Sequence, residues 1–257
     1  MGRLFRLPET AEMNRTIPIF NKIVNFPGKK ARGYEIKAKK SKEAEIWIYE
    51  EIGDSWFGGI SASQFSKDMK AYADTEKITV RINSPGGDVF DGIAIYNILK
   101  QHKAKVEVHI DGLAASIASV IAMAGDTIHI AENAMMMIHE AWTVVAGSSG
   151  MLREAADMLE KVNGQIVKTY MTRASVEEQQ IIDLMAAETW MTAEEAVEYG
   201  LADQMSESLD MAACFDLSKF KYRNAPAVDV PQGEPAIRQK LASMSMASRR
   251  IKAALTK

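Results

Sequence analysis

The sequence predicts an α/β domain built on a largely parallel sheet. Short apolar runs with strand-like alternation are followed by amphipathic helical stretches, and turns rich in glycine separate the two. This repeated order of strand, turn and helix is typical of folds in which crossover helices connect parallel strands. An apolar content of 47% in 257 residues is enough for a substantial core.

The first two strand–helix units lie within residues 45–101. Residues 45–49 alternate like a half-buried strand, residues 56–60 form a glycine-bearing loop, and residues 61–73 predict a helix with Phe65, Met69 and Tyr72 on one face. Residues 78–82 predict the second strand, which the turn at 84–87 ends, and residues 89–101 predict the second helix.

A third strand at 106–110 leads through Gly112 into a helix that begins near Ser116, and residues 127–130 and 134–138 predict two further short strands. Ligands of parallel sheets collect at the carboxyl ends of the strands. Since Gly87, Ser116 and His139 each follow a strand, we expect all three at one edge of the sheet.

Residues 149–173 predict a long helix with an apolar stripe. Such a helix either extends beyond the domain to pack on a neighbouring subunit or is an ordinary core helix. Pro226, Pro231, Gly233 and Pro235 then mark a linker before a basic stretch at 237–257, which predicts a short amphipathic helix or a disordered tail. The expected organisation is a basic arm (1–42), a domain (43–205) and a C-terminal linker with a basic tail (206–257).

Charge is distributed unevenly along the chain. The net charge of −3 does not indicate a nucleic-acid binder, but residues 1–42 hold eleven Lys and Arg residues against three Glu residues. This arm is a solvated linker, or it is a segment that binds a partner or is removed; a nucleic-acid contact would weaken steeply with salt. Cys214 alone excludes an internal disulfide. With no secretory signal and no apolar run long enough to span a membrane, we expect a soluble cytoplasmic protein.

Ser116 and His139 are the candidate nucleophile and base. Ser116 follows a glycine turn and two alanines at the start of a helix, where free N–H groups favour negative charge; a capping or buried serine is the alternative. His139 ends an apolar run that would keep its imidazole neutral, the form of a general base, although a strand-end histidine is often structural. Ser119, one helical turn later, is expected to be structural.

The turn at Gly86-Gly87 is either an ordinary turn or a donor of backbone N–H groups. In the second case the N–H groups of Gly87 and Ile117 would form an oxyanion hole. The histidines lack the spacing of metal ligands, and no phosphate-binding loop follows the glycines, so we expect neither a metal nor an organic cofactor.

Four ordered motifs together resemble the ClpP serine peptidase family. They are Ile82-Asn-Ser-Pro-Gly-Gly-Asp-Val, Gly112-Leu-Ala-Ala-Ser116, Met137-Ile-His139 and the stretch from Thr192 to Asp203. The resemblance covers residues 43–205 and implies a ClpP/crotonase-type ββα superhelix with a long protruding helix. The Met-rich histidine strand and the charged extensions are most similar to phage-encoded ClpP-like head maturation proteases.

Carried over by position, the resemblance implies that Ser116 is the nucleophile, His139 the base, and Gly87 and Ile117 the oxyanion donors. The acidic residue, which would be the third member of a Ser-His-Asp catalytic triad, departs from the family pattern. The family carries an aspartate six residues before the aromatic that corresponds to Trp190, and Leu184 occupies that position. We favour Asp183, one residue away, as the third member; Glu188, nearer to Trp190, is its rival.

The function expected from the sequence is therefore a serine endopeptidase that cleaves capsid or scaffold proteins during phage head maturation. The resemblance and the long helix both favour a homo-oligomer. The alternatives are an ATP-dependent ClpP-type housekeeping subunit with an ATPase unfoldase as partner, and a non-catalytic assembly protein on the same fold. A crotonase would leave Ser116 and His139 without a role.

Overall fold

The computed structural model describes residues 34–38, 42–53, 59–208, 217 and 222–225. Apart from Ala225, these residues belong to one compact unit, residues 1–224. Residues 1–33 of the expected arm, most of the expected loop at 56–60, Cys214 and the tail at 226–257 lie outside the described residues. Within the described part, no helix has both the length and the apolar character needed to cross a membrane.

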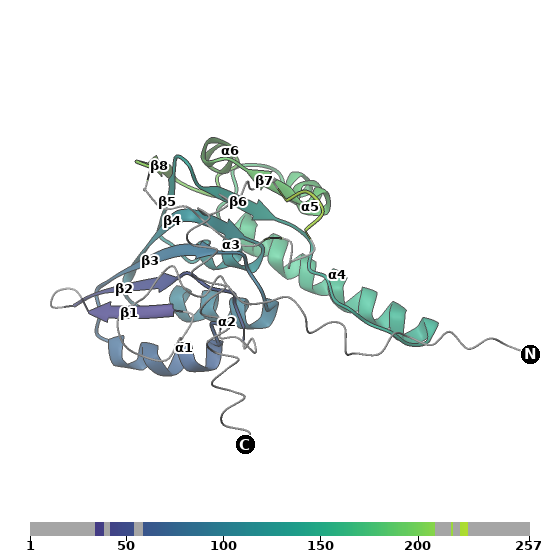
Figure 1. Ribbon diagram of the computed structural model, residues 1–257, viewed down its shortest axis with the longest axis horizontal. Coiled ribbons are helices and arrows are strands. Elements are labelled where there is room, and N and C mark those ends of the chain that lie inside the picture. Colours follow the sequence, from purple (N-terminus) through teal and green to yellow (C-terminus); the bar gives the residue numbers. More distant parts are fainter. Residues whose placement is uncertain (1–33, 39–41, 54–58, 209–216, 218–221, 226–257) are drawn as a thin grey trace, which may run out of the picture. The chain divides into compact units, whose positions relative to one another are not determined.

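The described part contains an eight-stranded mixed sheet with helices packed against it (Figure 1). The strands are β1 (Tyr34–Ala38), β2 (Glu43–Ile48), β3 (Lys77–Ser84), β4 (Lys105–Ala115), β5 (Thr127–Ala131), β6 (Met135–Ile138), β7 (Thr189–Met191) and β8 (Gln204–Ser206). The main path runs β1-β2-β3-β4-β5-β8, and its pairs are parallel except β1 with β2. The predicted α/β class is confirmed.

Strand β1 lies within the range that we expected to form a basic arm. It pairs antiparallel with β2, from Tyr34 opposite Ile48 to Ala38 opposite Ala44. Tyr34 is buried and packs edge-on against Phe65 of α1, with ring centroids 5.4 Å apart. The sheet therefore begins before residue 43, because β1 is hydrogen-bonded to β2 and its first residue, Tyr34, belongs to the core.

Six α-helices are described: α1 (Ala62–Met69), α2 (Val89–Lys100), α3 (Ile117–Ala122), α4 (Ser149–Met171), α5 (Glu178–Ala187) and α6 (Ala193–Glu198), with a short 3₁₀ turn η2 (Lys70–Tyr72) after α1. Helix α3 is wholly buried, as the alanines of its sequence permit. Helix α4 projects from the body (Figure 1), and its buried residues, Ile166, Val167 and Tyr170, all lie near its C-terminal end. The long helix thus extends beyond the domain.

Strand β4 is the element that positions the site. Its first half, Glu107 to Ile110, pairs with β5, whereas its last residues, Leu113 to Ala115, pair with β6. The sequence predicts a turn at Gly112, but the strand continues to Ala115 because β6 supplies a second hydrogen-bonding partner there. The residue after β4, Ser116, is therefore fixed at the point where β6 also ends.

A buried ion pair stabilises β4 just before this change of partner. Asp111 is 2% exposed and accepts two hydrogen bonds from Arg81 of β3, Nε to Oδ2 at 2.8 Å and Nη2 to Oδ1 at 2.5 Å. The Tyr49 hydroxyl donates to the same carboxylate at 2.5 Å. Burial raises the pKa of Asp111, while Tyr49 and Arg81 oppose that rise. The group joins β2, β3 and β4 through one carboxylate.

We predict that Asp111→Ala lowers the free energy of unfolding by about 3 kcal/mol, because it removes the carboxylate that accepts two hydrogen bonds from the partly buried guanidinium of Arg81 and leaves only the longer ion pair with Glu45, at 4.0 Å. Urea denaturation followed by circular dichroism measures the change. Asp74→Ala is the matched control, since the ion pair between Asp74 and Lys103 is exposed and contributes little. Equal destabilisation by the two substitutions would contradict this assignment.

Candidate active site

Ser116 occupies a sharp turn between the end of β4 and the start of α3. Its φ of 54° and ψ of −128° are unfavourable for a residue with a side chain, and such strain concentrates at functional sites. The turn is held by the Ser116 N–H, which donates to the Met137 carbonyl at 2.9 Å. Ser119, fully buried, donates to the Ser116 carbonyl at 2.5 Å and contacts the Tyr170 hydroxyl at 2.8 Å.

Strand pairing brings His139 to Ser116. Ala115 lies opposite Met137 in the parallel pair β4–β6, so the residues that follow each strand are neighbours. The Ser116 Oγ and the His139 Nε2 are 2.8 Å apart, which is hydrogen-bonding distance. A serine hydroxyl in contact with an imidazole is the arrangement in which the imidazole removes the proton during nucleophilic attack.

The surroundings of His139 favour the neutral imidazole. Burial lowers its pKa, the carboxylate of Glu188 opposes that shift, and the guanidinium of Arg223 adds to it. A general base must be unprotonated at the working pH. His139 therefore stays available as a base at pH values below those at which an exposed histidine becomes protonated.

Glu188 is the carboxylate next to His139. In the antiparallel pair β6–β7, Ile138 lies opposite Thr189, which places the residue before Thr189 beside the residue after Ile138. Glu188 is 4% exposed and has a left-handed backbone, with φ of 52°, where α5 ends. Burial opposes its ionisation, but hydrogen bonds from the Arg223 and Asn224 N–H groups and from Trp190, with the charge of His139, outweigh burial and lower the pKa of Glu188.

Asp183, the acid favoured from sequence, lies elsewhere. It is exposed on α5, and its carboxylate accepts a hydrogen bond from the Gln179 side chain one helical turn earlier, at 2.9 Å. Among the described residues, the carboxylate that shifts the pKa of His139 is that of Glu188. The structure thus brings together Ser116, His139 and Glu188, and it directs Asp183 to solvent.

The turn at Gly86-Gly87 lies against the Ser116 backbone. A Cβ on Gly86 would stand 2.7 Å from both the Ala115 carbonyl oxygen and the Ser116 Cβ, and one on Gly87 would stand 2.1 Å from the Ile52 oxygen. Both glycines have positive φ, 93° and 144°. The bonds that fix this turn run from Ile52 N to Gly86 O and from Asp88 N to Ile52 O, and neither uses the Gly87 N–H. Only glycine permits this close approach.

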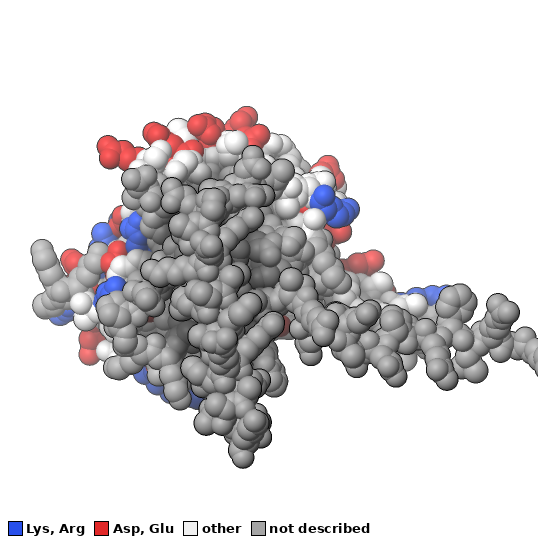
Figure 2. All heavy atoms as spheres, in the orientation of Figure 1, with Lys and Arg blue, Asp and Glu red and all other residues white. Residues whose placement is uncertain are grey.

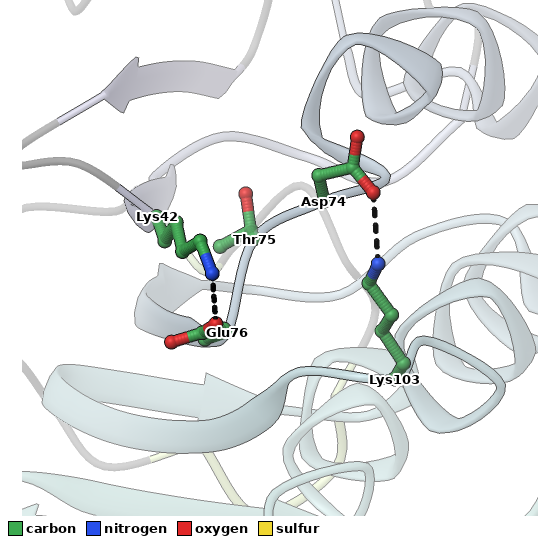
Figure 3. Close-up of a pocket in the computed structure, with 5 residues that line it drawn as sticks. All are labelled: Lys42, Asp74, Thr75, Glu76 and Lys103. Carbon is green, nitrogen blue, oxygen red and sulfur yellow. Dashed lines mark hydrogen bonds and ion pairs between the residues drawn. The ribbon is translucent and has the colours of Figure 1, made fainter.

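A polar surface hollow lies at the amino-terminal ends of the parallel strands, away from the ends that lead to Ser116 and His139 (Figure 3). Its lining residues, Lys42, Asp74, Thr75, Glu76 and Lys103, precede the parallel strands β2, β3 and β4, whereas Ser116 follows a strand. Each lysine is paired with a carboxylate, Lys42 with Glu76 and Lys103 with Asp74. Because ligands of parallel sheets bind at the carboxyl ends of the strands, this hollow is not the catalytic site.

Glu107, His109 and His129 are the group in the described residues that could hold a metal ion, since their ligand atoms lie within 4.8 Å of one another. The Glu107 Oε1 is 3.2 Å from the Nε2 of each histidine, and Lys77 pairs with the other carboxylate oxygen at 2.5 Å. The sequence does not reveal this group, because His109 and His129 become neighbours only through the pairing of β4 with β5. It lies on the first half of β4, before the residues that lead to Ser116.

Acidic side chains gather along the edge of the molecule that carries α6 and β8 (Figure 2). The first turn of helix α6 contains Glu194 and Glu195, and Glu195 completes a capping box with Thr192. A capping box satisfies two backbone N–H groups at a helix start, so Glu195 has a structural function. The edge accounts for part of the negative charge that the sequence places after residue 42.

The geometry defines the class of protein as a serine-type peptidase. A strained serine, an imidazole at hydrogen-bonding distance, a buried carboxylate beside that imidazole and a glycine turn against the serine are the parts of serine acyl-transfer chemistry.

Comparison with known proteins identifies the family. Residues 28–208 match the model of the Clp protease family, so the chain belongs to this family. It is 28% identical to an ATP-dependent Clp protease proteolytic subunit of Deinococcus radiodurans over 71% of this chain and 90% of that protein. It is 33% identical to the subunit of the same name from Ligilactobacillus salivarius, over 67% of this chain and 87% of that protein. The expected family, fold and peptidase class are confirmed.

We predict that Glu188→Gln lowers kcat by about 10² to 10⁴-fold, the range that follows when the orienting acid of a triad is neutralised. The acid limb of its pH–rate profile should also move to lower pH, since Glu188 is the group that raises the pKa of His139. Peptide hydrolysis measured from pH 5 to 9 checks both effects.

Asp183→Asn is the control for this experiment and should retain kcat within about twofold, because its exposed carboxylate contacts Gln179 instead of the imidazole. A large loss in Asp183→Asn with little loss in Glu188→Gln would restore Asp183 as the third member.

Proposed function

We propose that the chain is a serine endopeptidase in which Ser116 is the nucleophile, His139 the general base and Glu188 the orienting acid. The observation that carries this proposal is the 2.8 Å contact between the Ser116 Oγ and the His139 Nε2 at a strained strand-to-helix turn. Asp183, expected from sequence for the third role, is replaced in the proposal by Glu188, which is buried beside His139.

In this mechanism His139 takes the proton of the Ser116 hydroxyl as its oxygen attacks the scissile carbonyl. The negative charge that develops on the carbonyl oxygen is stabilised by the N–H groups of Gly87 and Ile117. Each such donor contributes on the order of 3 kcal/mol in other serine peptidases. His139 returns the proton to the leaving amine, and water then hydrolyses the acyl-enzyme with His139 again acting as base.

The role of Glu188 is to orient the imidazole and to stabilise its protonated form. An ionised carboxylate beside the imidazole can offset the charge that His139 acquires in each half of the reaction. Burial strengthens this interaction, because water screens the two charges less.

The relatives favour an ATP-dependent role over the capsid processing that we first expected. Both relatives named above are ATP-dependent Clp protease proteolytic subunits. We therefore propose a cytoplasmic subunit that receives polypeptide substrates from an ATPase unfoldase.

Phage head maturation, with a capsid or scaffold protein as substrate, is the second candidate. It is favoured by the sequence outside the family match: residues 1–27 and 209–257 extend beyond residues 28–208.

A homo-oligomer is part of the proposal. The projecting half of α4 exposes Met151 (51%), Leu152 (46%) and Met158 (57%) on a helix whose buried residues are confined to its other end (Figure 1). Exposed apolar side chains grouped on one element are typical of protein–protein contact sites. A second copy of the chain would cover this part of α4.

The other hypotheses are less consistent with the site. A crotonase would use the glycine turn alone and would leave the contact between Ser116 and His139 without a function. A non-catalytic assembly protein would have no need of a serine with φ of 54° in contact with a base.

We predict that Ser116→Ala lowers the rate of peptide hydrolysis by at least about 10³-fold while leaving the circular dichroism spectrum unchanged. Ser119→Ala is the matched control: the Ser119 hydroxyl bonds to the Ser116 backbone oxygen and to Tyr170, whereas the hydroxyl in contact with His139 is that of Ser116, so Ser119→Ala should retain measurable hydrolysis. Equal rates in Ser116→Ala and wild type would exclude this nucleophile.

Degradation assays with protein substrates distinguish the ATP-dependent role from phage head maturation. With a Clp ATPase and ATP, a folded reporter protein should be degraded, and short peptides should be cleaved without either. Failure of the ATPase to stimulate degradation, together with cleavage of a capsid or scaffold protein, would favour head maturation.

A further inference from the structure

A segment after the family match lies directly on the catalytic group. It consists of Leu217 and Tyr222–Asn224 in the described residues, and we refer to it as the strap. Leu217 and Tyr222 pack against an apolar cluster formed by Leu113, Ala115 and Met137, at the ends of β4 and β6. The strap therefore covers the part of the sheet from which Ser116 and His139 extend.

Tyr222 contacts both catalytic side chains. Its ring meets that of His139 edge-on, with centroids 5.4 Å apart, and that of Trp190 in the same manner at 5.6 Å. Its hydroxyl donates to the Pro85 carbonyl, which directly precedes the glycine turn. Burial raises the pKa of Tyr222, and a hydrogen bond with the Ser116 side chain opposes that rise. The phenol oxygen thus lies between the nucleophile and the turn proposed to hold the oxyanion.

The next two residues of the strap donate hydrogen bonds to the carboxylate of Glu188. The Arg223 N–H donates to Oε2 at 2.8 Å and the Asn224 N–H donates to Oε1 at 2.7 Å, so both oxygens accept from the strap. The Asn224 side chain also donates to the Ala187 carbonyl at 2.8 Å, and the Arg223 guanidinium to the Ala186 carbonyl at 2.8 Å. These bonds fix the strap at the junction of α5 and β7.

We propose that the strap is an intramolecular peptide ligand that occupies the substrate site, and that the enzyme becomes active when the strap leaves. This inference rests on the proposed function, since it takes Ser116 as the nucleophile. A scissile carbonyl must reach Ser116 with its oxygen toward the Gly87 N–H, and the hydroxyl of Tyr222 already bonds to the Ser116 side chain and to the carbonyl of Pro85, just before that turn. Substrate and strap therefore exclude each other.

The chemistry of the strap also indicates what displaces it. The aromatic side chain of Tyr222 contacts the rings of His139 and Trp190. Two consecutive backbone N–H groups then donate hydrogen bonds to the carboxylate of Glu188. An extended peptide with an aromatic or bulky apolar side chain can make the same contacts. A polypeptide substrate of this kind would compete with the strap for the site.

Departure of the strap changes the catalytic acid as well as access to the serine. While Arg223 and Asn224 bind Glu188, both of its carboxylate oxygens accept hydrogen bonds from the strap. Once they leave, Glu188 is free to accept from His139, and the positive charge of Arg223 is removed from the surroundings of the imidazole. Both changes raise the pKa of His139, so an enzyme that is mostly open should show the acid limb of its pH–rate profile at higher pH than an enzyme that is mostly closed.

The test uses the full chain with Tyr222→Ala, Tyr222→Phe and a control, Phe90→Ala, which removes an aromatic side chain that is 67% exposed on α2. We expect Tyr222→Ala to raise the rate of Ser116 labelling by a fluorophosphonate, and kcat/KM for a short peptide, by about tenfold, the effect of losing roughly 1.4 kcal/mol of strap binding. Tyr222→Phe keeps the ring and loses the hydroxyl, so its labelling rate and kcat/KM should lie between those of wild type and Tyr222→Ala. Both quantities should be unchanged in Phe90→Ala.

The pH–rate profile and a peptide added in trans complete the test. The acid limb of Tyr222→Ala should lie at higher pH than that of wild type. A synthetic peptide with the sequence of residues 217–225 should return the labelling rate and kcat/KM of Tyr222→Ala toward the wild-type values. The same peptide with alanine in place of the tyrosine should have no such effect.

The outcomes separate this inference from the proposed function. Labelling of Ser116 at equal or lower rates in Tyr222→Ala than in wild type would overturn the inhibitory role and leave the nucleophile assignment intact. A loss of hydrolysis in Tyr222→Ala with labelling retained would likewise overturn it, because the strap would then complete the site. Absence of Ser116 labelling in every form would instead reject the proposed function.

Discussion

The pairing of β6 with both β4 and β7 is the constraint on which the catalytic arrangement depends. The parallel register of Ala115 with Met137 places Ser116 beside His139, and the antiparallel register of Ile138 with Thr189 places Glu188 beside the same histidine. A shift of one residue in either pair would turn these side chains to opposite faces of the sheet. Strands β4, β6 and β7 therefore position groups that are far apart in the sequence.

The strain at Ser116 is supported by the packing around it. The unfavourable backbone of this residue is held by the Met137 carbonyl on one side and by Ser119 on the other, and Ser119 is itself held by Tyr170 of α4. Such strain persists only where the surrounding structure over-determines it. The C-terminal end of α4 thus supports Ser116, the proposed nucleophile, while its other end projects away from the body (Figure 1).

The sequence was sufficient to predict the groups that follow strands. Ser116, His139 and the glycine turn each end an apolar run, and parallel strands bring such ends to one edge. The acid could not be predicted in the same way, because the position of Glu188 depends on an antiparallel register and on a left-handed residue at the end of α5. The strap was also missed, since Tyr222 is far from Ser116 in the chain and no pattern marks its contact with His139.

The most direct test of this account is to map the residue that a fluorophosphonate modifies, by tandem mass spectrometry of the digested full-length protein. The account predicts a single adduct on Ser116, since this is the serine in contact with His139. An adduct on Ser84 or Ser119, or on any other residue in place of Ser116, would contradict it.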